Sequence, residues 1–153
     1  PSNNAKKIWI KDTSLAVNIC YEDVFGSEMV SRYDGKGGMP NLYINISNDA
    51  WYGKSIAAKQ HLQISQARAI ETGKMMIRST NTGVTAFIDI DGKVLEELPQ
   101  FMSGTLTHTV QGYNGRTPYT FFTNTPILLL SLSTILFYFL RSLFFFYKRK
   151  SSK

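Results

Sequence analysis

Cysteine is almost absent from this sequence, because Cys20 is the only one among its 153 residues. A lone cysteine excludes an intramolecular disulfide. The two histidines, His61 and His108, lie far apart, and the chain lacks a glycine-rich phosphate-binding motif, so the sequence predicts no metal and no cofactor site. Cys20 is therefore either a small buried apolar residue or a nucleophile.

Acidic residues are absent after Glu97, and no charge of either sign lies between Arg116 and Arg141. Residues 126–147 are mostly Leu, Ile and Phe. As a helix they would extend roughly 33 Å, against about 30 Å for the core of a bilayer. We expect a transmembrane helix over 126–147, with Arg141 extending toward the headgroups. A buried core helix or an amphipathic surface helix is the alternative, although the stretch is apolar on all faces.

The net charge of +6 comes mainly from the end of the chain. Five cations lie in or after the apolar stretch: Arg141, Lys148, Arg149, Lys150 and Lys153. The remaining part of the chain has twelve cations and eleven acidic residues, a net charge of +1, and contains no basic stripe. The basic charge therefore indicates membrane topology and predicts no nucleic-acid partner. The positive-inside rule places a basic tail, 148–153, in the cytoplasm and residues 1–115 on the other side, joined by a linker over 116–125.

Hydrophobic periodicity along residues 1–115 predicts an α/β fold. Helices are expected over 24–32 and 57–72, the second ending at Gly73. Strands are expected over residues 14–20, 42–47, 75–79, 84–90, 93–98 and 104–110. Cys20 then lies at the C-terminal end of a strand, where α/β folds bind ligands, and this position favours a nucleophile.

Three motifs carry a family resemblance. They are Ile19-Cys20-Tyr21-Glu22, residues 45–53 (NISNDAWYG) and residues 78–83 (RSTNTG). Together they resemble the nitrilase, or carbon–nitrogen hydrolase, superfamily, and within it the apolipoprotein N-acyltransferases. The resemblance runs from about Leu15 through the apolar stretch. It implies the C-terminal half of a four-layer α-β-β-α sandwich followed by one transmembrane helix, with residues 1–115 as the periplasmic catalytic portion at a bacterial inner membrane.

The same resemblance implies a Glu–Lys–Cys triad in which Cys20 matches the nucleophile. Glu22 matches a family acid, although a structural salt bridge is an open alternative. The backbone N–H of Tyr21 would help to bind the oxyanion. Trp51 and Tyr52 would line an acyl-chain or headgroup pocket, with core packing as the alternative.

The implied reaction transfers a fatty acyl chain through a Cys20 thioester. Its donor is a phospholipid, and its acceptor is the amine of the S-diacylglyceryl cysteine of an apolipoprotein. The triad's Glu and Lys precede the cysteine in this family, and no segment here resembles their context. The chain also begins at Pro1 without a signal peptide. We therefore expect the C-terminal part of a longer protein, which is inactive and does not fold by itself.

Four polar residues are expected to be structural, and three of them lie within these motifs. Asn48 and Asp49 would fix their loop through side-chain-to-backbone bonds, and Asn81 would support the turn at Gly83. His61, alone on a predicted helix, is expected to be a surface or capping group. Two other functions remain open: a membrane-tethered amidase that acts on a small C–N substrate, and an inactive membrane-anchored remnant.

Overall fold

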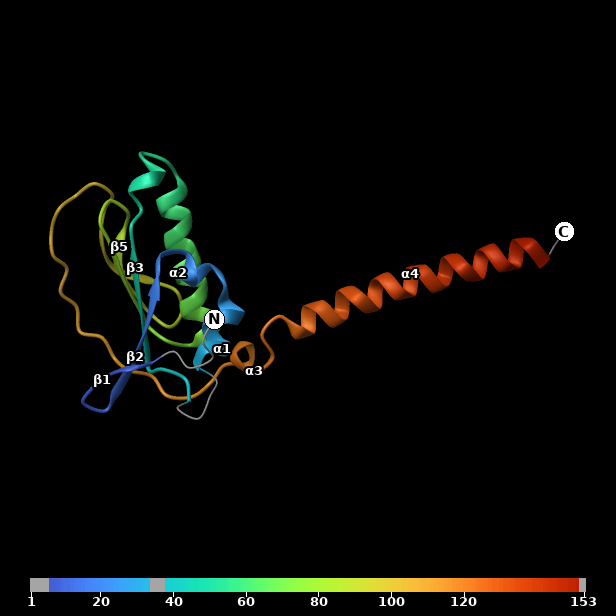
Figure 1. The fold of residues 1–153 in the computed structure, drawn as a ribbon, viewed down its shortest axis with the longest axis horizontal. Coiled ribbons are helices and arrows are strands. Elements are labelled where there is room, and N and C mark those ends of the chain that lie inside the picture. Colours follow the sequence, from blue (N-terminus) through green and yellow to red (C-terminus); the bar gives the residue numbers. More distant parts are fainter. Residues whose placement is uncertain (1–5, 34–37, 152–153) are drawn as a thin grey trace. The chain divides into compact units, whose positions relative to one another are not determined.

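The computed structural model describes residues 6–33 and 38–151. The chain forms two compact units, Pro1–Phe121 and Phe122–Lys153. The first unit is built on one six-stranded sheet with the strand order β1-β2-β3-β4-β5-β6 (Figure 1). Its strands are β1 (Ile8–Ile10), β2 (Thr13–Ile19), β3 (Leu42–Ser47), β4 (Met76–Thr80), β5 (Thr85–Ile88) and β6 (Val94–Leu98). The central strands β2, β3 and β4 are parallel, and the outer pairs are antiparallel.

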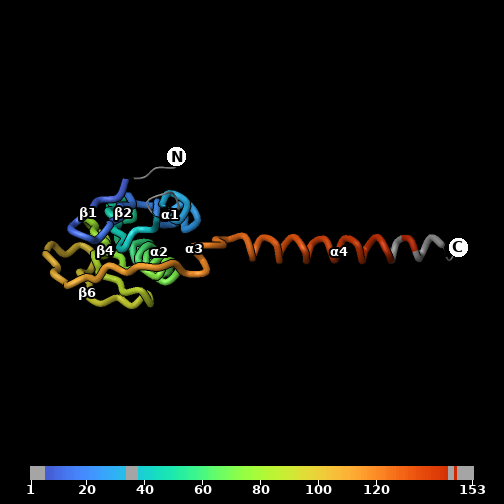
Figure 2. The backbone as a smooth tube through the Cα atoms, turned by 90° about the horizontal axis from the view of Figure 1, so that it is seen from below, coloured from blue at the N-terminus to red at the C-terminus, as the bar shows by residue number. Residues whose placement is uncertain are grey.

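Two helices supply the crossover connections between the parallel strands. They are α1 (Gly26–Tyr33) and α2 (Ala57–Thr72). Figure 2 shows both helices beside the sheet, and Figure 1 shows α2 along one side of it. Because side chains alternate along a strand, Ala16, Tyr43, Met76 and Ile88 fall on one face and join a single buried cluster with Leu62 of α2. The predicted α/β fold is confirmed.

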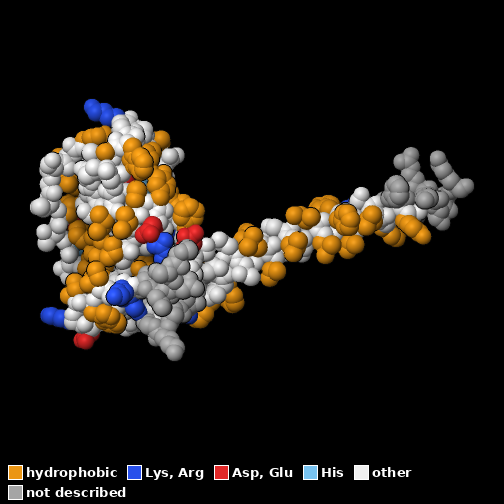
Figure 3. Space-filling model, in the orientation of Figure 1, with side chains coloured by type: hydrophobic (Ala, Val, Ile, Leu, Met, Phe, Trp, Pro, Cys, Tyr) orange, Lys and Arg blue, Asp and Glu red, His pale blue; other side chains and the backbone are white. Residues whose placement is uncertain are grey.

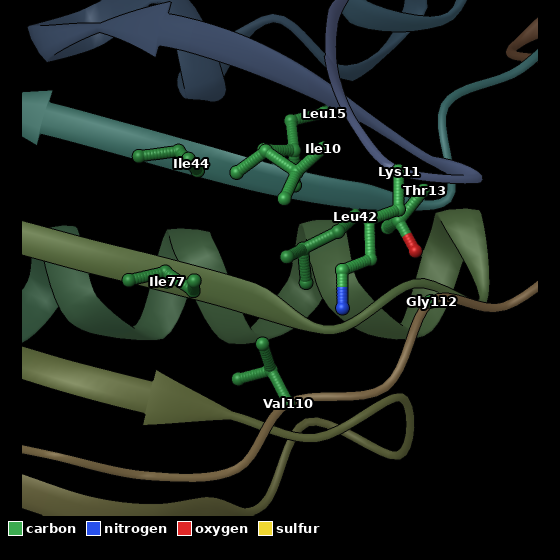
Figure 4. Close-up of a pocket in the computed structure, with 9 residues that line it drawn as sticks. All are labelled: Ile10, Lys11, Thr13, Leu15, Leu42, Ile44, Ile77, Val110 and Gly112. Atoms are coloured by element: carbon green, nitrogen blue, oxygen red, sulfur yellow. The ribbon is translucent and has the colours of Figure 1, made fainter.

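The opposite sheet face is also apolar but is covered only in part. Leu15 and Leu42 are buried there, and Ile44 and Ile77 are half-buried beside them. Val110, from the extended segment after β6, packs against this cluster. A hollow of about 400 Å³ remains between these side chains (Figure 4). One sheet with helices on one face makes up the α-β half of the predicted α-β-β-α sandwich.

The segment after β6 differs from the sequence prediction. The expected strand over residues 104–110 is wrong, because the chain leaves the sheet before it. Phe101 adopts a left-handed φ of 61° and its N–H donates to the carbonyl of Thr82 at 3.2 Å, which turns the backbone away from the edge of β6. Strand β1 and the short helix α3 (Pro118–Phe122), inside the predicted linker, were not expected.

The second unit consists mainly of α4 (Thr125–Ser151). Its stretch Thr125–Phe144 is long and apolar enough to cross a membrane, and its described side chains are exposed (Figure 3). The hydroxyls of Ser131 and Thr134 donate to helix carbonyls four residues earlier, both at 2.8 Å. Their polar groups are therefore satisfied within the helix, as an apolar surrounding requires. Of the predicted basic tail, residues 152–153 lie outside the described residues.

Gly73 ends α2 as predicted, with φ 63° and an N–H that donates to the carbonyl of Ala69 at 2.9 Å. A Cβ here would lie 2.9 Å from Cγ2 of Thr117. We predict that Gly73→Ala lowers the unfolding free energy of the complete protein by about 1–2 kcal/mol, because L side chains disfavour the left-handed region. Urea unfolding in detergent measures this. Gly73→Asn should lower the unfolding free energy less, since asparagine tolerates the left-handed conformation. An equal loss in both variants would assign the effect to the contact with Thr117 instead.

Candidate active site

The candidate site is built around a sharp turn at the C-terminal end of β2. Cys20 follows Ile19 directly and opens a 3₁₀ helix, η1 (Cys20–Val24). Its φ of 53° lies in the left-handed region, which non-glycine residues rarely adopt and which is common at functional sites. The Asn45 side chain of β3 donates to the Cys20 carbonyl at 2.9 Å. The strained conformation is thus held by a side chain from the neighbouring strand.

The Cys20 sulfur contacts one polar side chain. The Ser47 Oγ at the end of β3 lies 3.4 Å from Cys20 Sγ and 2.5 Å from Asp49 Oδ1. A hydroxyl has one hydrogen, so Ser47 can donate to only one of these acceptors at a time. Cys20 itself is half-buried. The thiol is therefore accessible in part and is linked through Ser47 to a buried carboxylate.

Glu22 closes the turn from the other side. One of its carboxylate oxygens accepts from the N–H of Ile19 at 2.7 Å, and the other lies 2.8 Å from the Arg32 guanidinium of α1. Both oxygens are thus engaged in holding the turn Cys20–Tyr21–Glu22, here called the nucleophile turn. The salt bridge that the sequence left open as an alternative is present.

Behind this turn lie four ionisable side chains, Asp23, Asp49, His61 and Arg78, which we call the buried charge cluster. All four are 2% exposed or less. His61 Nε2 lies 3.0 Å from Asp23, and His61 Nδ1 lies 3.2 Å from Asp49. Arg78 donates to Asp49 at 2.9 Å. The expectation that His61 is a surface or capping group is wrong, because α2 turns this residue toward the sheet.

Electrostatics in the cluster favour the charged forms. Burial by itself would lower the pKa of His61, but hydrogen bonds to Asp23 and Asp49 outweigh it and raise this pKa to about 9. Burial would raise the pKa of Asp49, but hydrogen bonds from His61 and Ser47 and the charge of Arg78 lower it to about 2. Both shifts favour the charged forms, a carboxylate at Asp49 and an imidazolium at His61.

Aromatic rings connect the cluster to the nucleophile turn. The Tyr21 ring stacks on the His61 imidazole with centroids 5.0 Å apart and an interplanar angle of 13°. Tyr52, in the short helix η2 (Ala50–Tyr52), meets the Tyr21 ring edge-on at 6.1 Å. Trp51 of the same helix is 77% exposed, which excludes core packing of this side chain within the unit. Tyr52 thus joins the site, and Trp51 extends away from the surface.

The loop after β3 is fixed by two asparagines. The Asn48 side chain accepts from the N–H of Ala50 at 3.1 Å, and Asn81 accepts from the N–H of Asp49 at 3.0 Å. The expected role of Asn48 is confirmed. The support that Asn81 was expected to give the turn at Gly83 is present as well, because Asn81 accepts from the N–H of Thr82 at 2.8 Å. For Asp49 the expectation of a side-chain-to-backbone bond is wrong, because its carboxylate enters the charge cluster. A Cβ at Gly83 would lie 2.1 Å from that carboxylate, so only glycine leaves room for it.

Sequence reasoning missed three residues of the site: Asp23, Ser47 and Ser65. The Ser65 hydroxyl donates to Asp23 at 2.6 Å. His61 and Ser65 lie four residues apart on a helix, which places them on the same face. That spacing, and the position of Asp23 directly after Glu22, were the features of the sequence that could have indicated these site residues.

We predict that Ser47→Ala slows alkylation of the Cys20 thiolate by iodoacetamide about tenfold, the effect of about 1.4 kcal/mol from one lost hydrogen bond. The rate is measured by mass spectrometry on the complete protein. Ser79→Ala, an exposed serine on the neighbouring strand β4, is the control and should leave the rate unchanged. An unchanged rate in Ser47→Ala would contradict the prediction and show that the hydroxyl donates to Asp49 alone.

Comparisons with known proteins agree with this geometry. The carbon–nitrogen hydrolase family model matches residues 4–119. The chain is 54% identical over 113 residues to an apolipoprotein N-acyltransferase of Nitrosomonas europaea, covering 74% of this chain and 22% of that protein. It is 44% identical over 140 residues to the apolipoprotein N-acyltransferase of Haemophilus influenzae, covering 92% and 26%. The chain thus spans about a quarter of the length of the curated relatives that it matches.

Among solved structures, a CN-hydrolase superfamily protein from Xanthomonas campestris superposes with a TM-score of 0.51. The two sequences are 20% identical, and the match covers 62% of this chain and 39% of that one. This likeness supports the fold alone.

Proposed function

The chain belongs to the carbon–nitrogen hydrolase family, and from this premise we propose that it is the nucleophile-bearing part of an enzyme that acylates the N-terminal amine of bacterial lipoproteins. The observation that carries the proposal is the Cys20 thiol, presented at a strand end by a strained turn whose backbone and flanks are fixed. The names of the relatives favour acyl transfer over hydrolysis. The apolar helix α4 fits an enzyme whose substrates reside in a bilayer.

In the first step the Cys20 thiolate attacks the ester carbonyl of a phospholipid. The Glu of the family triad takes the thiol proton, the C–S bond forms, the ester C–O bond breaks, and the lysophospholipid leaves after its oxygen has taken up that proton. The backbone N–H of Tyr21, directly after the nucleophile, stabilises the oxyanion of the tetrahedral intermediate. Glu22 holds the turn through Ile19 and Arg32.

In the second step the α-amine of an S-diacylglyceryl cysteine attacks the thioester. The amide bond forms, the C–S bond breaks, and the Cys20 thiol is regenerated. Tyr52 lies beside the turn, and with the exposed Trp51 of the same short helix it would line the path of the acyl chain or headgroup. The Glu and Lys that complete the triad of this family come from a part of the protein outside residues 1–153.

The proposed topology follows from charge and hydropathy. Residues 1–115 form the C-terminal portion of a periplasmic catalytic domain, 116–125 connect it to the membrane, 126–147 cross the inner membrane, and 148–153 form a cytoplasmic tail.

The test is the intact mass of the complete protein after incubation with phospholipid micelles. A fatty-acyl mass increase that hydroxylamine removes, absent from Cys20→Ala, is expected. No adduct on the complete protein, together with hydrolysis of small amides, would replace the proposal with a membrane-tethered amidase. If the complete protein forms no adduct and hydrolyses no amide, it is an inactive remnant.

A further inference from the structure

The buried charge cluster lies directly behind the nucleophile turn, and its chemistry is determined by hydrogen-bond direction. Carboxylates that are ionised accept hydrogen bonds and cannot donate them. His61 presents one ring nitrogen to Asp23 at 3.0 Å and the other to Asp49 at 3.2 Å. With both carboxylates ionised, both nitrogens carry hydrogen and the ring is an imidazolium.

The charges of the cluster balance in that state. Asp23 and Asp49 contribute two negative charges, and Arg78 contributes one positive charge. Other groups hold the two carboxylates in place, since Ser65 donates to Asp23 at 2.6 Å and Ser47 to Asp49 at 2.5 Å. A buried site of net charge −1 is costly, so the imidazolium makes the cluster neutral.

The exposed side of this imidazolium is covered by the nucleophile turn. Tyr21 stacks on it at 5.0 Å with nearly parallel planes, and Tyr52 meets it edge-on at 6.4 Å. A cation against an aromatic face is attractive, more so when it is shielded from water. Tyr21 is 44% exposed and follows Cys20 in the chain, and its ring is held by the stack on His61 and by the edge-on contact with Tyr52.

We propose that His61 is a positioning residue for acyl transfer, a buried cation that holds the Tyr21 ring and thereby the Cys20–Tyr21 peptide in the orientation that the oxyanion requires. The inference rests on the proposed function, because it assigns the N–H of that peptide to the oxyanion. His61 touches neither substrate nor the sulfur in this scheme. Its effect passes through the ring of Tyr21.

The test is a double-mutant cycle on the single-turnover rate of Cys20 acylation in the complete protein. His61→Gln removes the cation, Tyr21→Leu removes the ring, and the double variant removes both. Each single variant should slow acylation about 100-fold, the scale of a 1 Å misplacement of reacting groups, with the donor's KM changed less than about twofold. The double variant should be no slower than the slower single variant, because both changes break one contact.

Two outcomes overturn the proposal. Losses that multiply in the double variant would show that His61 acts independently of Tyr21, as a purely structural residue does. A loss confined to KM would assign His61 to donor binding. Lys59→Gln, exposed on the same helix, is the control and should react at the wild-type rate.

A second measurement covers the case in which His61→Gln does not fold. The wild-type acylation rate should fall as pH rises through about 9, where the imidazolium loses its proton to solvent. The groups that face the ring are Asp23 and Tyr21 of η1, Asp49 after β3, Tyr52 of η2 and Arg78 of β4. Tyr21→Leu should lack this alkaline decrease, and an unchanged decrease in that variant would refute the coupling.

Failure of the inference and of the proposed function are distinguishable. A wild-type protein that forms no acyl adduct refutes the function. The same cycle is then run on the rate of Cys20 acylation by p-nitrophenyl acetate, which passes through an oxyanion and needs no lipid substrate. Losses that multiply in the double variant there refute the positioning role.

Discussion

Arg78→Met should lower the unfolding free energy by about 3–5 kcal/mol, the range for removing one partner of a buried ion pair. Arg78 is fully buried and donates to Asn45, Ser65 and Asp49 at 3.1, 3.0 and 2.9 Å. Methionine fills a similar volume, but only the positive charge of His61 then remains to balance the two buried carboxylates. The loss is therefore electrostatic rather than a packing defect.

Denaturant unfolding of the complete protein in detergent measures this loss. Lys59→Met removes a positive charge from an exposed position on α2 and should change the free energy by less than about 0.5 kcal/mol. A loss below about 1 kcal/mol in Arg78→Met would mean that the carboxylates take up protons when the guanidinium is removed.

Stability should also decrease at alkaline pH. The pKa of His61 is raised from 6.5 to about 9 in the folded protein, so its contribution is complete below about pH 6.5 and is lost as pH rises through about 9. At 1.36 kcal/mol for each pKa unit, the loss is about 3 kcal/mol. The pKa of Asp49 is lowered from 3.8 to about 2, so its contribution is present above about pH 4 and is lost as pH falls through about 2.

Urea unfolding of the complete protein at pH values from 5 to 10 provides the test. The midpoint should be highest between about pH 4 and 6.5 and should fall steadily to about pH 9. His61→Gln is less stable throughout but should lack this alkaline slope, because the titrating group is gone. A wild-type midpoint that is constant between pH 6.5 and 9.5 would contradict the imidazolium assignment.

Features that depend on neighbours in sequence were predictable. Gly73 ends α2 because only glycine readily adopts the left-handed conformation there. The apolar stretch forms a helix because no glycine or proline interrupts it after Pro126. The helix over 57–72 and the strand over 42–47 were predicted with the bounds that the structure has, since their buried residues recur with the period of each element.

Features that depend on contacts between distant segments were not predictable. Residues 104–110 have the composition of a strand but cross the open sheet face, because the backbone turns at Phe101 and leaves the edge of β6. His61 resembled a surface residue because a helix exposes most of its polar side chains. Its burial became intelligible only when Asp23, Asp49 and Arg78 were seen around it.

The sequence by itself determined the family, the α/β fold, the apolar helix and the candidacy of Cys20, because each rests on a short motif or a local period. The tertiary structure alone decided what surrounds the thiol. Asp23, Asp49, His61 and Arg78 come from four separate elements, and burial makes their charges interdependent. Their protonation and their contact with Tyr21 depend on distances of about 3–5 Å across the fold, which no local pattern encodes.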